Sequence, residues 1–395
     1  MKLLNKTLED ISEVIAGQSP PSSTYNNLGN GVPFFQGMAD FGEKHPKVRF
    51  YCTQPTKISN PNDILISVRA PVGPVIINNV KACIGRGLGI IRLNKNISLD
   101  YVYYYLKVNE KRISDLGVGS TFKAITQKNL KKVEIVIPEN LTDQIRIAEI
   151  LSQAEALIAQ RKQSISLLDE LLKSTFLEMF GDPVKNEKGL KKVKLVDITT
   201  KITDGKHGDC NDEENSGYYF LSAKDLINGE LKYHNVREIT QADFIEVHKR
   251  TALKLNDILL GNTGASIGKI GIVKDEEKAS KTVFQKSISI ISVKNEIILP
   301  HYLKAYLDYN RSIFNATSTG SAMPNLLLSQ IRAFDIIVPS IKLQNEFIRI
   351  VEKVEALKTQ YQQSLTELQN MYGVLSQKAF KGELNIKEIK IKVKV

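Results

Sequence analysis

The sequence contains no tryptophan, only three cysteines and five histidines, and no long hydrophobic run. The cysteines lie far apart, at Cys52, Cys83 and Cys210, which argues against a disulfide framework or a zinc site and fits a reducing compartment. No two histidines have metal-ligand spacing. No apolar segment approaches the roughly 18 residues of a transmembrane helix, and the first residues turn polar too soon for a signal peptide. We therefore expect a cytoplasmic protein with no metal site and no membrane contact.

Motifs for catalysis are also missing. An adenine methyltransferase needs an Asn/Asp-Pro-Pro-aromatic loop, and neither Asn60-Pro61-Asn62 nor Asp182-Pro183-Val184 fits it. The glycines between 264 and 270 resemble a phosphate-binding loop, but the spacing is one residue short and Ile270 stands in place of Ser or Thr, which indicates a glycine-rich turn. A Ser-His-Asp triad assembles in space, so spacing does not exclude it, but no histidine lies in a nucleophile-elbow context. We expect no enzyme and no cofactor in this chain.

Basic residues are in excess. The 395 residues include 54 Lys and Arg against 43 Asp and Glu, a formal charge of +11. A balance of this size favours an anionic partner, usually nucleic acid, although many lysine-rich surfaces bind nothing acidic. Lysines cluster at 185–201 and at 381–394, whereas the segment 142–180 is not basic. The positive charge is therefore expected mainly outside that segment.

The chain contains one unit twice. Residues 135–138 (Ile-Val-Ile-Pro) recur 201 positions later as 336–339 (Ile-Ile-Val-Pro), and the same offset aligns Gly-Ser at 119–120 with Gly-Ser at 320–321. Further matches follow in the same order on both sides of these motifs. A conserved order of matches indicates an internal duplication, which must be recognised before the fold is considered.

Each copy has a globular part and a helical part. Residues 1–140 and 183–340 are rich in short β-branched runs punctuated by Gly, Pro and Asn, which predicts short strands, loops and a few helices. Residues 141–182 and 341–384 have apolar residues three and four apart, which predicts long amphipathic helices over Thr142–Phe180 and about Leu343–Phe380, with Gly373 expected to interrupt the second. Residues 385–395 form a basic tail.

The apolar stripes of these helices are the predicted packing surface. Their members are Ile147, Leu151, Ile158, Ile165, Leu168 and Leu172 in the first helix, and Val351, Val354, Tyr361, Leu365 and Leu368 in the second. Two exposed stripes in one chain most simply pack on each other, which predicts antiparallel coiled-coil helices with a globular part at each end. One interpretation is a spacer or dimerisation stalk. The other, which the duplicated globular part favours, is a ruler between two recognition modules.

Candidate DNA-contacting side chains lie on polar, glycine-containing loops, because bases are read by such side chains on loops that a scaffold holds. The candidates are Ser19, Arg69, Arg86, Ser120, Thr121, Lys123, Lys206, His207, Asn262, Thr263, Ser266, Lys269 and Ser321. A purely structural role is the alternative for each. A Gly-Ser pair can serve only as a turn, and His207 can be a loop histidine bonded to the backbone.

Taken in order, these motifs resemble the specificity subunit of type I restriction–modification systems. The duplicated pattern above is followed each time by a long helix. Residues 176–189 (Phe-Leu-Glu-Met-Phe-Gly-Asp-Pro-Val-Lys-Asn-Glu-Lys-Gly) resemble the family's junction between the central helix and the second recognition domain, although Leu190 stands where the family often has Trp. Residues 202–207 (Ile-Thr-Asp-Gly-Lys-His) resemble its Asp-Gly-x-His loop, and 17–20 and 379–384 resemble its opening loop and its usual ending.

The resemblance implies an α/β fold with two target recognition domains, 1–140 and 183–340, joined by the two conserved antiparallel helices. Each domain would read one half of a split site in double-stranded DNA, the halves about one helical turn or ~34 Å apart. The helices would dock two methyltransferase subunits that bind S-adenosylmethionine, with restriction subunits that use ATP and Mg²⁺ as an optional addition. The half-sites should differ, because the units have diverged. The alternative is a coiled-coil adaptor that reads no DNA sequence.

Overall fold

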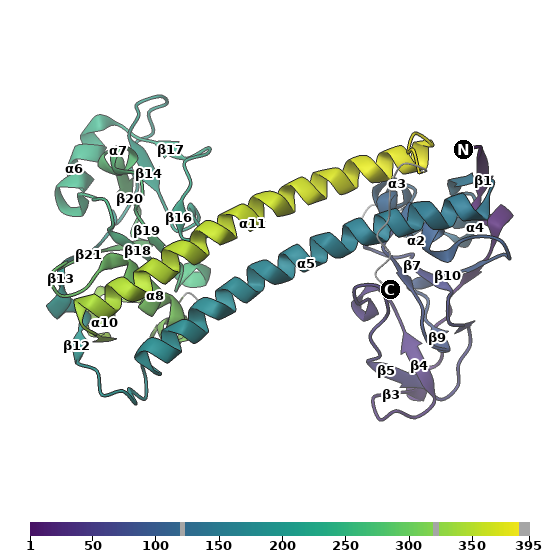
Figure 1. Cartoon of the computed structure of the whole chain (residues 1–395), viewed down its shortest axis with the longest axis horizontal. Helices are drawn as coiled ribbons and strands as arrows, with labels where there is room; N and C mark the ends of the chain where they lie inside the picture. Colours follow the sequence, from purple (N-terminus) through teal and green to yellow (C-terminus); the bar gives the residue numbers. More distant parts are fainter. Residues whose placement is uncertain (119–122, 319–323, 387–395) are drawn as a thin grey trace. The chain divides into compact units, whose positions relative to one another are not determined.

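The computed structural model describes residues 1–118, 123–318 and 324–386 and divides into two compact units (Figure 1). Unit 1 comprises Met1–Gln163 and Gln362–Val395, and unit 2 comprises Ser164–Tyr361. The long helices α5 (Leu141–Phe180) and α11 (Ile341–Lys381) each contribute a segment to both units. Each unit therefore combines a mixed α/β globular part with one segment from each long helix.

A four-stranded antiparallel sheet forms the centre of each unit. In unit 1 its order is β2 (Ser12–Ala16), β10 (Leu88–Leu93), β7 (Ile64–Ser67) and β8 (Val75–Ile77). In unit 2 the order is β13 (Thr199–Asp204), β21 (Ile288–Val293), β18 (Ile258–Gly261) and β19 (Ile270–Ile272). Every residue of β7 and of β18 is buried, so these strands are covered on both faces. This explains their continuous apolar sequence.

Strand register aligns the two sheets residue by residue. The matching pairs are Ala16 with Gly89 and Ser67 with Leu88 in unit 1, and Asp204 with Ser289 and Gly261 with Ile288 in unit 2. Positions in the loops that leave these strands therefore correspond as well, which allows a direct comparison of the two units.

The units differ in the layer beside this sheet. In unit 1 it is a five-stranded sheet of β3 (Tyr25–Asn26), β5 (Phe50–Cys52), β4 (Val32–Phe35), β9 (Ala82–Ile84) and β6 (Ile58–Ser59). In unit 2 it is β17 (Arg237–Glu238), β14 (Tyr219–Leu221) and β20 (Thr282–Phe284), with the hairpin β15 (Leu226–Ile227) and β16 (Glu230–Leu231). Cys52, Cys83 and Cys210 are buried and free.

Short helices and two-stranded ribbons complete each unit. Unit 1 contains β1 (Leu3–Thr7), β11 (Glu134–Pro138), α1 (Leu8–Ile11), α2 (Leu99–Val108), α3 (Glu110–Asp115) and α4 (Gln127–Lys131). Unit 2 contains β12 (Lys192–Lys194), β22 (Asp335–Ile337), α6 (Gln241–Thr251), α7 (Glu276–Ser280), α8 (Pro300–Tyr309), α9 (Arg311–Thr317) and α10 (Leu328–Arg332). The repeated Ile-Val-Ile-Pro motif thus forms β11, and its second copy spans β22 and the residues that follow it.

A buried glutamine fixes the start of each long helix. Gln144 accepts a hydrogen bond from the Ser98 backbone at 2.9 Å and donates one to the Pro138 carbonyl at 2.9 Å. Gln344 accepts one from the Leu299 backbone at 2.8 Å and donates to the Pro339 carbonyl at 2.9 Å. Backbone groups that would otherwise be buried without partners are thereby satisfied.

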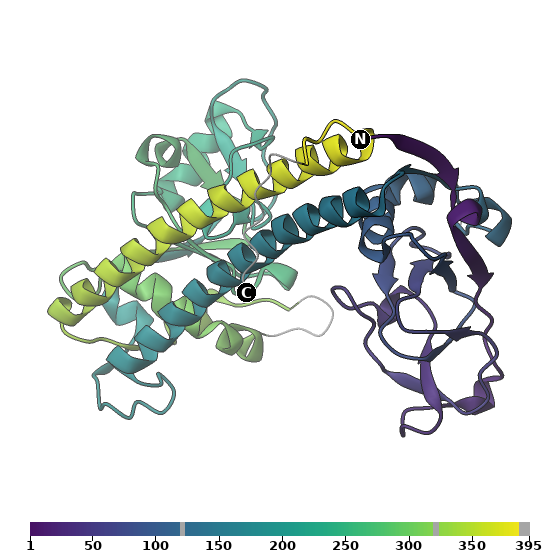
Figure 2. The same cartoon turned by 45° about the vertical axis from the view of Figure 1, so that its right-hand side comes forward.

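In each unit the C-terminal end of one long helix packs near the start of the other, α11 in unit 1 and α5 in unit 2. In unit 1 the Phe380 ring packs against Tyr105 with centroids 5.0 Å apart, and in unit 2 Phe180 packs against Tyr302 with centroids also 5.0 Å apart. The Tyr302 hydroxyl donates to the Ile337 carbonyl at 2.9 Å, and burial raises its pKa, so it stays a donor. Figure 2 shows the end of α11 beside the N-terminal strand, where a Cβ on Gly382 would lie 2.5 Å from Leu3.

Residues of the apolar stripes lie inside the units. Ile147, Leu151, Leu168, Val354 and Leu365 are buried. Ile158, Ile165, Leu172, Val351, Tyr361 and Leu368 are half-buried. In unit 2 the helix segments run antiparallel, because Asp169 pairs with Lys358 at 2.6 Å whereas the later Phe176 packs on the earlier Phe347, with centroids 5.7 Å apart.

One expectation about the second long helix is wrong. Gly373 does not interrupt α11, which continues to Lys381. A glycine inside a helix costs only about 1 kcal/mol relative to alanine, and the apolar residues that follow Gly373 pack into the core of unit 1. The predicted helix ends at Phe180 and Phe380 agree with the observed ends at Phe180 and Lys381 to within one residue, because Gly181 (φ +75°) and Gly382 (φ +77°) adopt the left-handed conformation that terminates a helix.

The buried glutamine generates a stability prediction. Gln344→Met keeps the side-chain volume but leaves the Leu299 N–H and two carbonyl groups without their partner, so we expect the free energy of unfolding to fall by about 1–3 kcal/mol. Urea denaturation of the full chain measures this change. Gln369→Met, at an exposed position of the same helix, is the control. Equal stability of the two variants would contradict the role assigned to Gln344.

Candidate nucleic-acid interface

One end of each central sheet gathers the loops that carry most predicted DNA-contacting residues. In unit 1, β2 and β7 end here and β10 begins here. The loop after β2 carries Ser19, the loop after β7 carries Arg69, and the turn before β10 carries Arg86. The fold therefore brings together three predicted side chains from separate parts of the sequence.

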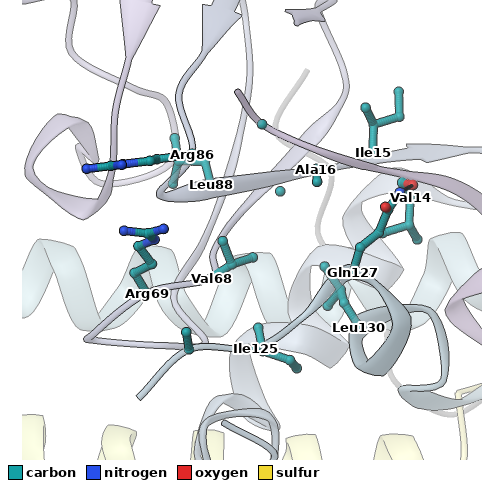
Figure 3. Close-up of a pocket in the computed structure, with 13 residues that line it drawn as sticks. Val14, Ile15, Ala16, Val68, Arg69, Arg86, Leu88, Ile125, Gln127 and Leu130 are labelled. Atoms are coloured by element: carbon teal, nitrogen blue, oxygen red, sulfur yellow. Dashed lines mark hydrogen bonds between the residues drawn. The ribbon is translucent and has the colours of Figure 1, made fainter. Parts of the chain in front are cut away.

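Arg69 and Arg86 line two adjoining cavities of unit 1 (Figure 3). One cavity, of about 180 Å³, has an apolar lining that includes Val68, Leu88 and Ile125. Ser19 lies on the other, and its Oγ accepts a hydrogen bond from the Arg86 backbone at 3.2 Å. Both arginine side chains are exposed, and neither has an ion pair or side-chain hydrogen bond within the part of the chain that the structure describes.

In each unit a glycine allows close contact between two loops of this edge, the loop after β2 or β13 and the turn before β10 or β21. Gly17 donates a hydrogen bond to the Leu88 carbonyl at 3.0 Å, and Gly205 donates one to the Ile288 carbonyl at 3.2 Å. A Cβ on Gly17 would lie 2.2 Å from the Gly85 oxygen, and one on Gly205 would lie 2.0 Å from the Phe284 oxygen. No other residue fits here without backbone movement, which explains the glycine in both loop motifs.

The equivalent positions of unit 2 carry different chemistry. By strand register, His207 corresponds to Ser19, Thr263 to Arg69 and Lys286 to Arg86. His207 Nε2 lies 2.7 Å from Asp204 Oδ2, and Arg250 Nη1 donates to Asp204 Oδ1 at 2.7 Å. Burial alone would raise the pKa of Asp204, but the hydrogen bonds from Arg250 and His207 outweigh it and lower the pKa. Asp204 thus stays charged and orients His207.

Lys206 is also held by neighbouring acids. Its Nζ lies 3.2 Å from Glu246 and 3.5 Å from Asp243, both on α6. The hydrogen bond with Glu246 raises the pKa of Lys206. Unit 1 lacks a counterpart of α6 at this place in its described sequence, so this neutralisation is specific to unit 2.

The polar side chains of the loop after β18 mostly form hydrogen bonds within unit 2. Asn262 is 4% exposed and donates to Ser289 Oγ at 2.8 Å, so its amide supports the loop from inside. Lys269 Nζ donates to the Ala223 carbonyl at 3.1 Å, and Ser266 Oγ donates to the Thr263 carbonyl at 2.5 Å. Thr263 is half-buried, and its hydroxyl lies 3.0 Å from the Asn262 side chain.

Lys123 is the remaining predicted residue that the structure describes. Lys123 is exposed and precedes Ala124, which bridges to the backbone of Arg69. Ser120, Thr121 and Ser321 lie outside the described residues. Of the described residues, Ala124 bridges Arg69 and Asn325 bridges Thr263, so both lie beside the same sheet edge of their unit.

Two residues of this region were not predicted. Arg250 lies on α6, which has no counterpart among the described residues of unit 1, and no sequence pattern pointed to it. Lys286 is exposed in the turn before β21, and the repeat itself could have identified it, since it lies 200 residues after Arg86.

Within residues 1–118, 123–318 and 324–386, no group of three His, Cys, Asp or Glu side chains could hold a metal ion. None of the described helices combines the length and the apolar character that crossing a membrane requires.

Comparison with known families identifies the chain. A family model described as "Type I restriction modification DNA specificity domain" matches the chain twice, over residues 3–167 and 187–369. The chain belongs to this family, and the two matches correspond to the internal duplication.

Relatives agree with this assignment. A putative type I restriction enzyme MjaX specificity subunit of Methanocaldococcus jannaschii is 44% identical over 166 residues, which cover 42% of this chain and 39% of that protein. The MjaIX specificity subunit of the same organism is 24% identical over 97% of this chain and 94% of its own length. The EcoKI specificity subunit of Escherichia coli is 22% identical over 83% of this chain and 76% of its own length.

Solved structures share the fold. The S subunit of a type I restriction–modification system from M. genitalium superposes with a TM-score of 0.59 at 18% identity, covering 96% of both chains. A chain from a study of complex assembly and conformational transition of the type I R-M system gives 0.58 at 14% identity, covering 97% of this chain and 98% of its own.

These findings confirm the prediction of a type I specificity subunit, and they favour it over a coiled-coil adaptor. The relatives are named as specificity subunits, in agreement with a role in specificity rather than catalysis.

The glycine contact generates a second prediction. Gly17→Ala forces the loop that carries Ser19 away from the turn that carries Arg86, so we expect weaker discrimination in one half of the DNA site and an unchanged other half. Binding to DNA fragments altered in one half at a time measures this. Gly37→Ala is the control, because its extended backbone and open surroundings accept a Cβ. Loss of discrimination in both halves, or in neither, would contradict the prediction.

Proposed function

We propose that this chain reads an asymmetric, bipartite site in double-stranded DNA, one half with each unit. The observation that carries the proposal is the repeated sheet edge. The same three loops meet at that edge in both units, held by the same glycine contact, but they present different side chains. A conserved scaffold with variable loop residues is suited to recognition of different sequences.

Charge distribution supports a difference between the half-sites. In unit 1, Arg69 and Arg86 are exposed and have no partner among the described residues, whereas in unit 2 Lys206 is paired with acids of α6. Arginine, histidine and threonine prefer different base edges. Lysines on exposed surface, such as Lys123 and Lys128, are suited to phosphate contacts, which add affinity without reading sequence.

The long helices are proposed to serve the rest of a complex. Leu157 is 48% exposed in unit 1, and Leu167 and Leu171 are 52% and 47% exposed in unit 2. Leu167 and Leu171 lie one turn apart on α5, and neighbouring exposed apolar side chains are suited to protein partners. The proposed partners are two methyltransferase subunits that carry S-adenosylmethionine, with restriction subunits that use ATP and Mg²⁺ as an optional addition. The proposed location is the cytoplasm, and continuous helices shared by both units are proposed to set the spacing of the half-sites.

Domain exchange tests the proposal. Replacing residues 190–340 by the corresponding domain of another family member, in the complex with methyltransferase subunits, should change the bases of one half-site only. Selection of bound sequences from randomised DNA measures both halves at once. The reciprocal exchange of residues 1–140 should change the other half. A change in both halves from a single exchange, or in neither, would refute the modular assignment.

A further inference from the structure

We propose that the turn before the last sheet strand carries a guanine-reading cation in each unit, Arg86 in unit 1 and Lys286 in unit 2, and that unit 1 adds a second one, Arg69. The inference rests on the proposed function and assigns a base to these positions. Guanine presents two acceptors, O6 and N7, on its major-groove edge, and donation to both by Arg or Lys is the commonest specific contact between proteins and DNA.

Arg86 and Lys286 occupy the same position of the same turn. Leu88 is paired with Ser67 and Ile288 with Gly261, and each cation lies two residues before its strand begins. Both turns form hydrogen bonds with a neighbouring loop, the loop after β2 in unit 1 and the loop after β13 in unit 2. The Arg86 N–H donates to Ser19 Oγ at 3.2 Å, and the Lys286 N–H donates to the Lys206 carbonyl at 3.0 Å. The backbone is thereby fixed while the side chain extends outward.

The three cations are available to a ligand. Arg69, Arg86 and Lys286 are exposed, and none has an ion pair or side-chain hydrogen bond within the described ranges of the chain. Other cations near these sites are occupied, since Lys206 pairs with Glu246 at 3.2 Å and Arg250 with Asp204 at 2.7 Å. A guanidinium offers five donors in a fixed planar fork, so two unpaired guanidiniums on one cavity provide unused donors in a defined geometry.

The surroundings favour a base edge over a phosphate group. Arg69 and Arg86 come from different segments but line the same cavity, whose lining also includes the apolar Val68, Leu88 and Ile125 (Figure 3). At the position of Arg69, a phosphate contact would be needed equally in both units, because phosphate contacts are independent of sequence. Arg69 instead corresponds to Thr263, although both residues follow strands of the same register and both form a bridge, to Ala124 and to Asn325. Variation of a side chain at a position that the same strand pairing holds is expected for base reading.

The test uses the full chain in complex with its methyltransferase subunits and a randomised DNA library. Glutamine reads adenine rather than guanine. Arg86→Gln and Arg69→Gln should therefore each lose the preference for guanine, by about 5- to 150-fold, at one position of the half-site read by unit 1. Lys286→Gln should do so in the other half. Arg86→Lys should keep the preference, and Arg112→Gln, at an exposed arginine of unit 1 that pairs with Glu134, should change none.

Several outcomes would overturn the inference. A uniform loss of affinity with unchanged base preference would mean phosphate contacts, and a change at a position that is not a G·C pair would mean a different base. Unchanged preferences in all three glutamine variants, with a bipartite preference in the unaltered chain, would refute the inference and leave the proposed function intact. Absence of any base preference in the unaltered chain would refute the proposed function itself. Thermal melting confirms that each variant is folded, and the three sites are tested independently.

Discussion

In unit 1 the backbone of the loop after β2 lies directly against the turn before β10, and in unit 2 the loop after β13 lies against the turn before β21. The arrangement of the candidate DNA-contacting loops depends on this contact. Gly17 and Gly205 are the residues at the contact, and a Cβ at either would approach a backbone oxygen within 2.2 Å or 2.0 Å. The contact fixes the loop that carries Ser19 or His207 beside the turn that carries Arg86 or Lys286. Duplication preserved this constraint while the side chains around it diverged.

A second repeated constraint anchors the long helices to the globular parts. Gln144 and Gln344 satisfy backbone groups at the start of each helix, and Phe380 and Phe180 pack at the end of each on a tyrosine-bearing helix. Each unit is thus assembled from its own globular part, the helix that follows it and the helix of the other copy. Exchange of one globular part would therefore leave both long helices in the chain.

Much of this architecture could be predicted from local patterns. The internal repeat, the long helices and the loop motifs depend on periodicity and residue type, which the sequence displays directly. Gly373 was misjudged because packing of the residues after it outweighs a modest helix penalty. Hydrogen bonds and ion pairs between side chains that are distant in the sequence could not be predicted. Asn262 is a polar loop residue in the sequence but is buried against Ser289. Lys206 is paired with acids of α6, which has no counterpart in the part of unit 1 that the structure describes. Lys286 could have been predicted from the internal repeat, since it aligns with Arg86.

The most direct test of the central claim, that this chain alone sets the DNA sequence on which its partners act, is a map of modified adenines in the genome of cells that carry it, compared with cells from which its gene has been deleted. The account predicts a single asymmetric motif made of two specific parts separated by an unspecified spacer, present in the first cells and absent from the second. A motif that persists after the deletion, or a continuous palindrome in its place, would contradict the account.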